Sequence, residues 1–252
     1  MTANARTTLW IWPSGLFPRR LVYYFLAKGI TPSSLKQHNI DLVPIQLTLS
    51  PPTLQALQGH EPRPADASLP ILRIAHADGR IVWIRESVSI LEYLEELFPS
   101  SAGWTDLCGE NAEQRAQTRD VVGILNDAMH WSLIWLVHSD IRTTSWSGLA
   151  EQDMSPSTAR HAEARFHFYL SRLERWVQED NWSGTKHASL AGLLLLAQVE
   201  YYKSTYNSDW IAGYALLGQW VIDMKMEAWA VSSEKLKGPE RGEGWAVLFG
   251  GT

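Results

Sequence analysis

Cysteine is almost absent from this 252-residue chain, which contains one, Cys108. A single cysteine cannot form a disulfide within the chain, and there is no Cys-x-x-Cys pair. Because exchange of a mixed disulfide needs a protein thiolate, thiol transfer and disulfide reduction are disfavoured as activities. We interpret Cys108 as a structural residue of a linker.

Concentrated positive charge is missing as well. Twenty-two basic and 27 acidic side chains give a formal net charge of -5, and no run of Lys or Arg occurs. Proteins that bind nucleic acid carry a basic patch, so we expect no nucleic-acid partner.

Long hydrophobic runs are also lacking. The longest, near residues 190–199, falls well short of the roughly 20 residues that a membrane-spanning helix needs, so no membrane partner is expected. The first ten residues lack the apolar core of a signal peptide. We therefore expect a soluble, cytoplasmic protein.

Motifs for metals and nucleotides are not found either. The eight histidines are scattered without ligand spacing, and there is no Gly-rich phosphate loop or dinucleotide fingerprint. Tryptophan is abundant instead, with thirteen residues. Its large apolar area suits cores and interfaces, and a minority of the thirteen is expected to line a pocket for a bulky apolar ligand.

The first half of the chain predicts a strand, a helix and a second strand. The strands are expected at residues 8–12 and 40–47, and the helix is expected to begin at Pro18 and end at Gly29. Such a βαβ unit requires parallel strands. Residues 50–68 read as a proline-rich loop with one or two helical turns near Leu54 and Leu57.

Residues 69–98 carry the most informative pattern. Two short apolar runs, 71–75 and 81–84, flank Asp78-Gly79, the preferred two-residue loop of a tight hairpin, in which both positions have positive φ. An amphipathic helix follows, with Ser87 as its predicted N-cap and Pro99 after its end. Its buried stripe is predicted to be Ile90, Leu94, Leu97 and Phe98.

This stretch resembles the closing half of the glutathione-binding domain of cytosolic glutathione transferases. The resemblance implies that the Leu69-Pro70 peptide is cis, that the backbone of Leu69 pairs with the cysteinyl part of glutathione, and that Glu86 and Ser87 hold its γ-glutamyl end. A helix N-terminus suits a carboxylate, and Glu86 can pair with the ammonium. Taken singly, Ser87 is also an ordinary helix cap and Pro70 an ordinary trans proline.

The resemblance also implies the fold class, which is α+β. A thioredoxin-like β-α-β-α-β-β-α domain is expected at 1–100, and an all-helical domain at 110–252. Helical patterns indeed run from about Glu110 to His138, from Ser155-Pro156 onward and after Ser189. A last long helix is marked by Leu217, Trp220, Val221, Met224 and Ala228, and the tail from Ser232 reads as loop. A homodimer is expected from the resemblance alone.

In the family, a hydroxyl or thiol in the turn after the first strand stabilises the glutathione thiolate. Ser14 is the only such side chain in that turn, and it is the catalytic candidate; the alternative is a plain turn residue. Counting back from Arg20, the family's position falls at or next to Gly15, so backbone N–H groups around Gly15 and Leu16 are a second alternative. Lowering a thiol pKa of about 8.5 by about two units needs roughly 2.7 kcal/mol.

Two further groups of residues are candidates for binding. His60 and Arg63 are candidates for the glycine carboxylate of glutathione, with a solvated surface position as the alternative. Leu16 and Phe17, with Trp131, Ile134 and His138, are predicted to line the second-substrate pocket, with core packing as the alternative.

Three functions remain open on the sequence. The first is a transferase that adds the glutathione thiolate to an electrophilic, apolar and conjugated small molecule. The second is a glutathione-dependent cis/trans isomerase of a conjugated double bond in natural-product (polyketide) biosynthesis, because the chain is similar to fungal transferases of secondary metabolism. The third is a binding or scaffold protein of the same fold without turnover.

Overall fold

The computed structural model describes residues 5–49, 52–179 and 188–236. By their contacts they form two compact units. The first comprises the chain up to Leu107, Val199–Ser208 and the chain from Lys225, and the second comprises Cys108–Gln198 and Asp209–Met224. Helices α7 (Leu190–Tyr206) and α8 (Ala215–Met226) therefore belong partly to each unit, whereas the sequence-based range 110–252 contains both entirely.

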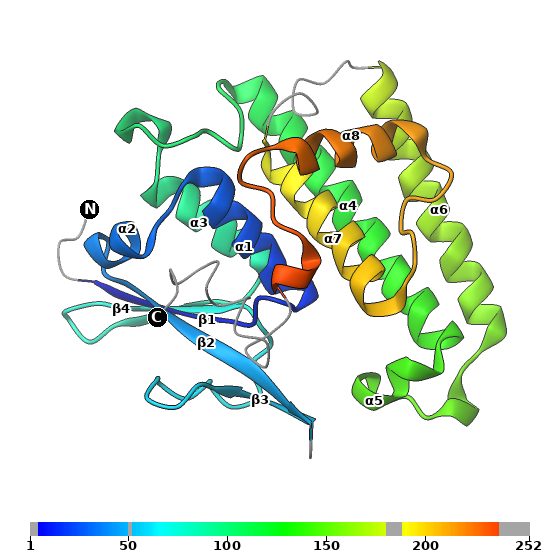
Figure 1. The fold of residues 1–252 in the computed structure, drawn as a ribbon, viewed down its shortest axis with the longest axis horizontal. Helices are drawn as coiled ribbons and strands as arrows, with labels where there is room; N and C mark the ends of the chain where they lie inside the picture. Colours follow the sequence, from blue (N-terminus) through cyan, green and yellow to red (C-terminus); the bar gives the residue numbers. More distant parts are fainter. Residues whose placement is uncertain (1–4, 50–51, 180–187, 237–252) are drawn as a thin grey trace. The chain divides into compact units, whose positions relative to one another are not determined.

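The first unit is built on a five-stranded sheet with the order β3-β2-β1-β4-β5. Strands β1 and β2 are parallel, as the βαβ pattern predicted, and the other neighbours are antiparallel. Figure 1 shows α1 and α3 on one side of this sheet. The bounds are β1 Arg6–Ile11, α1 Leu16–Lys28, α2 Pro32–Gln37, β2 Ile40–Leu49, β3 Pro52–Ala56, β4 Ile71–Ala75, β5 Ile81–Ile84 and α3 Ser87–Leu97.

Strand β3 corrects the helical turns predicted near Leu54. Residues 52–56 pair antiparallel with β2, with Ala56 opposite Ile45. Leu54 and Ala56 both pack on the buried cluster that contains Trp10. In a strand, residues i and i+2 point to the same face. In a helix, one of these two side chains would point away from the cluster.

Two turns differ in detail from the predictions. Helix α1 begins at Leu16 with Gly15 as its N-cap, so Pro18 is the third helical residue; this position also has no intrahelical N–H bond to lose. In the hairpin only Gly79 has positive φ, 85°, and the N–H of His76 donates to the oxygen of Arg80 at 2.9 Å. The loop is therefore a three-residue turn with glycine in the left-handed position.

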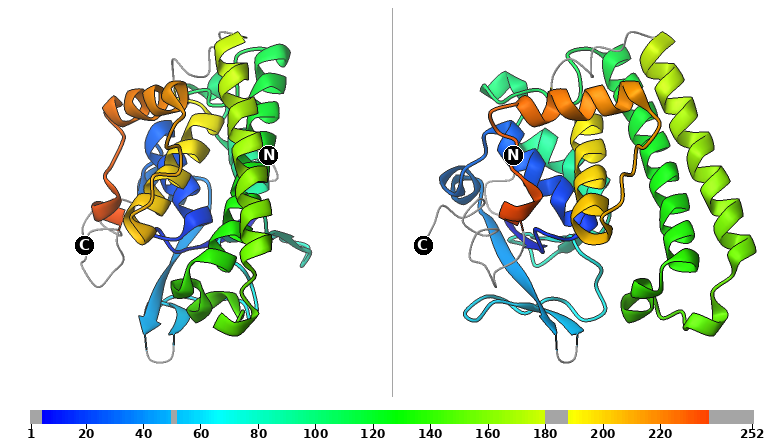
Figure 2. Two further views of the ribbon diagram at one scale, coloured as in Figure 1. Left: turned by 90° about the vertical axis from the view of Figure 1, so that its right-hand side faces the viewer. Right: turned by 45° about the vertical axis from the view of Figure 1, so that its right-hand side comes forward.

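The second unit is helical, as predicted. Helices α4 (Ala112–Ser139) and α6 (Pro156–Glu179) lie side by side in all views (Figures 1 and 2). The predicted caps are present: Ser155 Oγ accepts the Thr158 N–H at 3.2 Å, and Ser189 Oγ accepts the Gly192 N–H at 3.2 Å. Helix α5 (Thr144–Ser147) is a single turn between α4 and α6.

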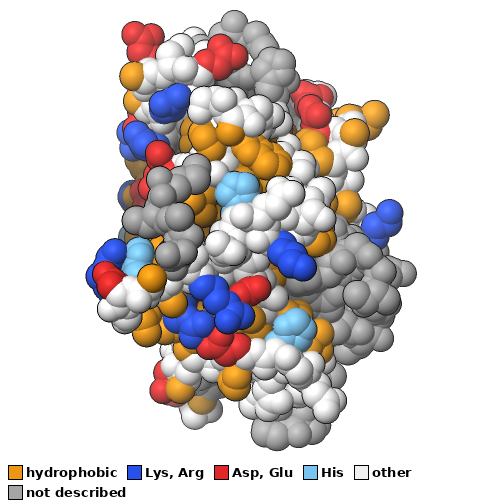
Figure 3. Space-filling view, turned by 90° about the vertical axis from the view of Figure 1, so that its left-hand side faces the viewer, with side chains coloured by type: hydrophobic (Ala, Val, Ile, Leu, Met, Phe, Trp, Pro, Cys, Tyr) orange, Lys and Arg blue, Asp and Glu red, His pale blue; other side chains and the backbone are white. Residues whose placement is uncertain are grey.

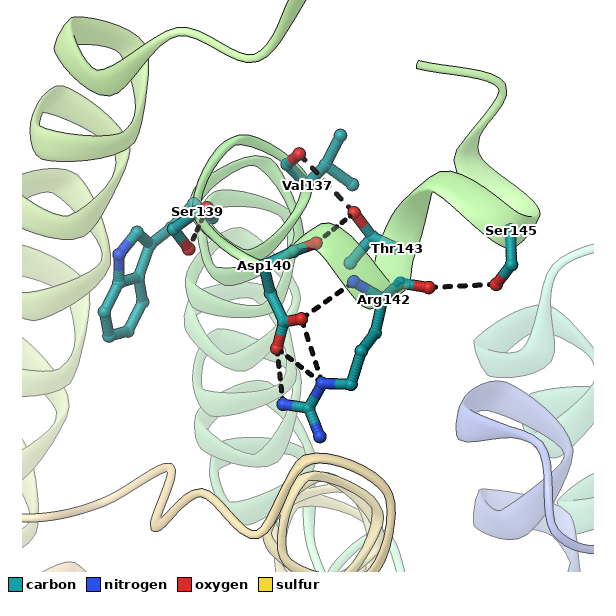
Figure 4. A network of polar contacts seen from close by, with 7 residues as sticks. Val137, Ser139, Asp140, Arg142, Thr143 and Ser145 are labelled. Carbon is teal, nitrogen blue, oxygen red and sulfur yellow. Dashed lines mark hydrogen bonds and ion pairs between the residues drawn. The ribbon is translucent and has the colours of Figure 1, made fainter. Parts of the chain in front are cut away.

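A polar network ends helix α4 (Figure 4). The Asp140 carboxylate accepts hydrogen bonds from the backbone N–H of Arg142 at 3.0 Å and from its Nε at 2.9 Å, and it also pairs with Nη2. Thr143 Oγ1 donates to the Asp140 carbonyl oxygen at 2.7 Å. The hydrogen bonds from Arg142 lower the pKa of Asp140, so this carboxylate stays ionised and fixes the turn out of α4.

Helix α7 is buried along most of its length, and helix α8 is buried on one face. Residues 190–200 of α7 are all buried, which confirms that this helix is central. On α8, the predicted residues Leu217, Trp220, Val221 and Met224 are buried, but Ala228 is exposed and lies beyond the helix end at Met226. The predicted loop after Ser232 begins with a short 3-10 turn, Ser233–Leu236, and its remainder lies outside the described residues. Within the described ranges, no helix is long and apolar enough to span a membrane.

Candidate functional site

The turn after β1 presents donors at the start of α1. The N–H of Gly15 is already used, because it donates to the Trp12 oxygen at 3.0 Å. Leu16 and Phe17 are the first two helical residues, and the first N–H groups of a helix have no intrahelical acceptor. No acceptor for these two N–H groups occurs elsewhere in the described parts of the chain. Leu16 and Phe17 therefore replace Gly15 as the backbone donors of this turn.

Ser14 lies just before this helix start and is half-buried. Its carbonyl oxygen accepts a hydrogen bond from Arg19 Nη2 at 3.2 Å, whereas its hydroxyl makes none with the residues that the structure describes. Arg19 is itself buried and also reaches Ser204 Oγ at 3.4 Å. The hydroxyl is thus available as a donor on a backbone that is held in place.

Gly15→Ala is expected to disrupt this turn. A Cβ at Gly15 would lie 2.7 Å from Trp12 Cε3 and 3.2 Å from Pro18 Cδ, and neither ring can move away cheaply. Overpacking of this kind costs about 1–3 kcal/mol, so thermal denaturation should show a lower Tm. Gly123→Ala on the exposed face of α4, where a Cβ meets nothing within 4 Å, is the control. Equal Tm values for the two variants would contradict the tight turn.

The Leu69-Pro70 peptide is cis, as the resemblance implied. Strand β4 starts at Ile71, which pairs with Trp10, so Leu69 lies beside the end of β1 and the turn that follows it. Neither the N–H nor the carbonyl of Leu69 is hydrogen-bonded within the described residues. This backbone is open to pair with an extended ligand.

Helix α3 begins at the predicted Glu86-Ser87 pair. Glu86 is the N-cap and Ser87 the first helical residue, which corrects the prediction that Ser87 is the cap. Ser87 is buried, and its Oγ accepts a hydrogen bond from Arg20 Nη1 at 3.2 Å. The Glu86 side chain is exposed and can meet a cation.

In the sequence, Arg20 serves only as the reference from which the family's catalytic position is located. Its hydrogen bond to Ser87 is not predicted from the sequence. Its guanidinium is buried and lies 5.2 Å from the centre of the Phe17 ring. Burial lowers the pKa of Arg20 to about 10, partly opposed by nearby Glu86, so the side chain stays charged at neutral pH. Sequence could have singled it out as a cation on the buried face of α1. It joins the start of α1 to the start of α3.

The tyrosines of α1 pack in the interior, as predicted. Tyr23 and Tyr24 are buried, and Tyr23 donates its hydroxyl to the Val231 carbonyl at 3.3 Å. Burial raises the pKa of Tyr23. Both are packing residues.

The two candidates for the glycine carboxylate lie apart. Arg63 Nη1 donates to the Ala67 carbonyl at 2.5 Å, two residues before Leu69. His60 is exposed and borders a cavity with Thr8 and Asp41. Thr8 and the end of β1 at Ile11, near Leu69, are separated by about 10 Å at roughly 3.3 Å per strand residue. The structure therefore groups Arg63, but not His60, with Leu69.

The predicted second-substrate residues belong to different units. In the first, Leu16 is buried and Phe17 is half-buried under Arg20. In the second, Trp131 contacts the His161 ring edge-on at 5.5 Å, Ile134 is 38% exposed, and His138 Nδ1 accepts the Ser155 N–H at 3.1 Å. That these two sets line one pocket stays a prediction. Among the described side chains, no group of three or more His, Cys, Asp or Glu could hold a metal ion.

No protein-family model and no curated protein matches this sequence. Several solved structures, in contrast, are similar to this chain. A glutathione transferase of Methylobacillus flagellatus with glutathione bound is 16% identical over 88% of this chain and 96% of its own, with a TM-score of 0.61. A maleylacetoacetate isomerase of Anaeromyxobacter dehalogenans with glutathione in its active site is 20% identical over 94% and 97%, with a TM-score of 0.59. A Populus trichocarpa glutathione transferase is 14% identical over 88% and 95%, with a TM-score of 0.57.

These likenesses establish the fold. The chain has the glutathione transferase fold, with a thioredoxin-like part and a helical part, and the predicted α+β class is confirmed.

Proposed function

We propose that this protein is a glutathione-dependent transferase that adds the glutathione thiolate to an electrophilic carbon of an apolar, conjugated small molecule. One observation carries the proposal. Within the first unit, the open N-terminus of α1 with Ser14 and the open backbone of Leu69 lie beside the end of β1, and Arg20 of α1 is hydrogen-bonded to Ser87 at the start of α3. These groups are complementary to the thiol, the cysteinyl backbone and the γ-glutamyl end of glutathione.

The γ-glutamyl end would sit at the start of α3. Its carboxylate would accept hydrogen bonds from the free N–H groups there and from the Ser87 hydroxyl, with the buried charge of Arg20 beneath. Its ammonium would pair with the exposed Glu86 carboxylate. The cysteinyl backbone would pair with Leu69, and Arg63 is the better placed of the two candidates for the glycine carboxylate.

The sulfur would then lie at the turn after β1. Ser14 and the N–H groups of Leu16 and Phe17 are the donors that would favour thiolate over thiol. Hydrogen bonds to a charged group contribute about 1.5–3 kcal/mol each, so one or two supply the roughly 2.7 kcal/mol that lowers the thiol pKa by about two units. The second substrate would lie against Leu16 and Phe17, with Trp131, Ile134 and His138 as the predicted opposite wall.

An isomerase is the second candidate, supported by the fold likeness to a maleylacetoacetate isomerase. The thiolate would add to a conjugated double bond, the resulting single bond would rotate, and elimination would restore both the double bond and glutathione. A natural-product (polyketide) intermediate of fungal secondary metabolism is the proposed substrate of this variant. A cytoplasmic homodimer is proposed for either.

Ser14→Ala tests the thiolate site. The pKa of bound glutathione, followed through the ultraviolet absorbance of its thiolate, should rise by about one to two units on loss of this donor. Ser33→Ala, at an exposed position of α2, should leave the pKa unchanged. An unchanged pKa in Ser14→Ala would transfer the role to the backbone donors.

Product analysis separates the candidate functions. Stoichiometric loss of glutathione with an electrophile establishes transfer, and an isomerised product with glutathione conserved establishes isomerisation. Binding without turnover on a panel of electrophiles favours the non-catalytic alternative. Absence of binding at millimolar glutathione would refute the proposal.

A further inference from the structure

Arg19 is a cation in the interior of the first unit. Its side chain is 1% exposed, whereas on the face drawn in Figure 3 Lys and Arg side chains lie at the surface beside acidic ones, where charged side chains usually lie. Burial lowers the pKa of Arg19, and nearby Tyr23 and Glu200 oppose this. Burying a charge is costly, so packing alone would be served as well by an apolar side chain.

The side chain of Arg19 joins the turn after β1 to helix α7. Nη2 donates to the Ser14 carbonyl oxygen at 3.2 Å, and both Nη1 and Nη2 lie 3.4 Å from Ser204 Oγ. The guanidinium also lies 5.6 Å from the centre of the Tyr201 ring. Both of these α7 residues belong to the first unit, together with the turn. The connection is therefore made within one compact unit.

The directions of these hydrogen bonds are fixed. Ser204 Oγ donates its proton to the Tyr201 carbonyl oxygen at 3.2 Å, so its lone pairs accept from the guanidinium, which only donates. The backbone N–H of Arg19 donates to the Gly15 carbonyl oxygen at 3.0 Å. Arg19 thus holds two successive carbonyl groups of the turn, one with its backbone and one with its side chain, and the side chain is anchored on α7.

We propose that Arg19 is a positioning residue that holds Ser14 so that its hydroxyl donates to the glutathione thiolate, an inference that rests on the proposed function. The residue four positions after Ser14 is Pro18, which has no N–H to offer the Ser14 carbonyl. Arg19 supplies the hydrogen bond in its place. Because hydrogen bonds weaken steeply when their geometry departs from the ideal, the last turn of α7, acting through Ser204 and Arg19, sets how strongly the thiolate is favoured.

Ser204→Ala tests this inference, because it removes one hydroxyl and leaves Arg19 in place. The pKa of glutathione bound to the full chain, followed through the ultraviolet absorbance of its thiolate, should rise by about 0.5 unit. Thr205→Val removes the hydroxyl of the exposed neighbour on α7 and should leave the pKa within about 0.2 unit. At about pH 5, where the thiol is protonated, both variants should bind glutathione as the parent chain does.

Arg19→Met and Arg19→Lys separate position from charge. Lysine keeps the positive charge but lacks the planar fork that reaches two oxygens at once. Both variants should therefore raise the pKa of the bound thiol by about one unit. A parent-like pKa in Arg19→Lys would show that charge alone is responsible, and it would overturn the positioning role.

A double variant tests whether Ser204 and Arg19 act through the Ser14 hydroxyl. Ser14→Ala combined with Ser204→Ala should have the same thiol pKa as Ser14→Ala alone, because effects within one hydrogen-bonded network are not additive. A further rise in the double variant would overturn the inference, as would an unchanged pKa in Ser204→Ala. A cooperative thermal transition verifies that each variant is folded.

Glutathione binding by the parent chain distinguishes this inference from the proposed function. A parent chain without affinity for glutathione would overturn the proposed function and this inference with it. Binding and turnover with the same thiol pKa in the parent chain and in Ser204→Ala would overturn only the role of Arg19.

Discussion

Glu86→Gln should raise the dissociation constant of glutathione roughly 10- to 100-fold, because a hydrogen bond between charged groups contributes about 1.5–3 kcal/mol. The exposed Glu86 carboxylate stands at the start of α3, where it is proposed to pair with the γ-glutamyl ammonium. Isothermal titration at low ionic strength measures the change. Its size should shrink as salt is added.

Arg85→Gln is the matched control, because Arg85 is the exposed neighbour of Glu86 and has no place in the proposed site. Its affinity for glutathione should stay within about twofold of the parent chain, well below the 1.4 kcal/mol that a tenfold change represents. Similar losses in both variants would mean that general charge, and not the Glu86 contact, decides binding. An unaltered affinity in Glu86→Gln would remove this residue from the site.

Lys28→Met should destabilise the protein by about 3 kcal/mol, because removal of one partner leaves the other charge buried. Lys28 Nζ on α1 lies 2.7 Å from Glu95 Oε1 on α3, and the two side chains are 0% and 12% exposed. For a chain of this length the expected fall in Tm is roughly 6–12 °C, measured by thermal denaturation. Lys203→Met, at an exposed position, should change stability by less than about 0.5 kcal/mol.

The loss in Lys28→Met should depend on pH. Burial raises the pKa of Glu95 even though Lys28 and Tyr24 oppose it. A carboxyl whose pKa is raised in the folded state favours folding below its unfolded pKa, and this contribution is lost as pH rises through the folded value. Without Lys28 the pKa rises further, so the deficit should be larger near about pH 8 than near about pH 5. A deficit independent of pH would show that lost packing, and not the charge of Glu95, is the cause.

A double variant separates charge from packing. Lys28→Met with Glu95→Leu removes both charges, and replacement of a buried pair by apolar side chains is often neutral or stabilising. Recovery of most of the lost stability is therefore expected. A double variant no more stable than Lys28→Met would show that the unpaired charge of Glu95 is not the cause of the loss.

Local sequence patterns were sufficient to place the helices and strands that are determined by interactions between neighbouring residues. Alternation and turn residues placed β4, β5 and the hairpin between them, and capping residues placed the starts of α6 and α7. The cis peptide at Leu69-Pro70 was expected from the family resemblance, not from the residues alone. Strand β3 was missed because its two inward residues, Leu54 and Ala56, are explained only by the cluster around Trp10 against which they pack.

From the sequence by itself came the strand, hairpin and helix pattern of residues 69–98, and the family resemblance of that pattern implied the fold class and the roles proposed for the Leu69-Pro70 and Glu86-Ser87 pairs. Tertiary structure decided which groups meet across long separations. It placed the guanidinium of Arg20 against Ser87, 67 residues away. It directed the Gly15 N–H to the Trp12 oxygen within the same turn. It also separated His60 from Leu69. The reason is that a buried side chain takes its partner from the packing of whole helices and strands, which no spacing along a single element records.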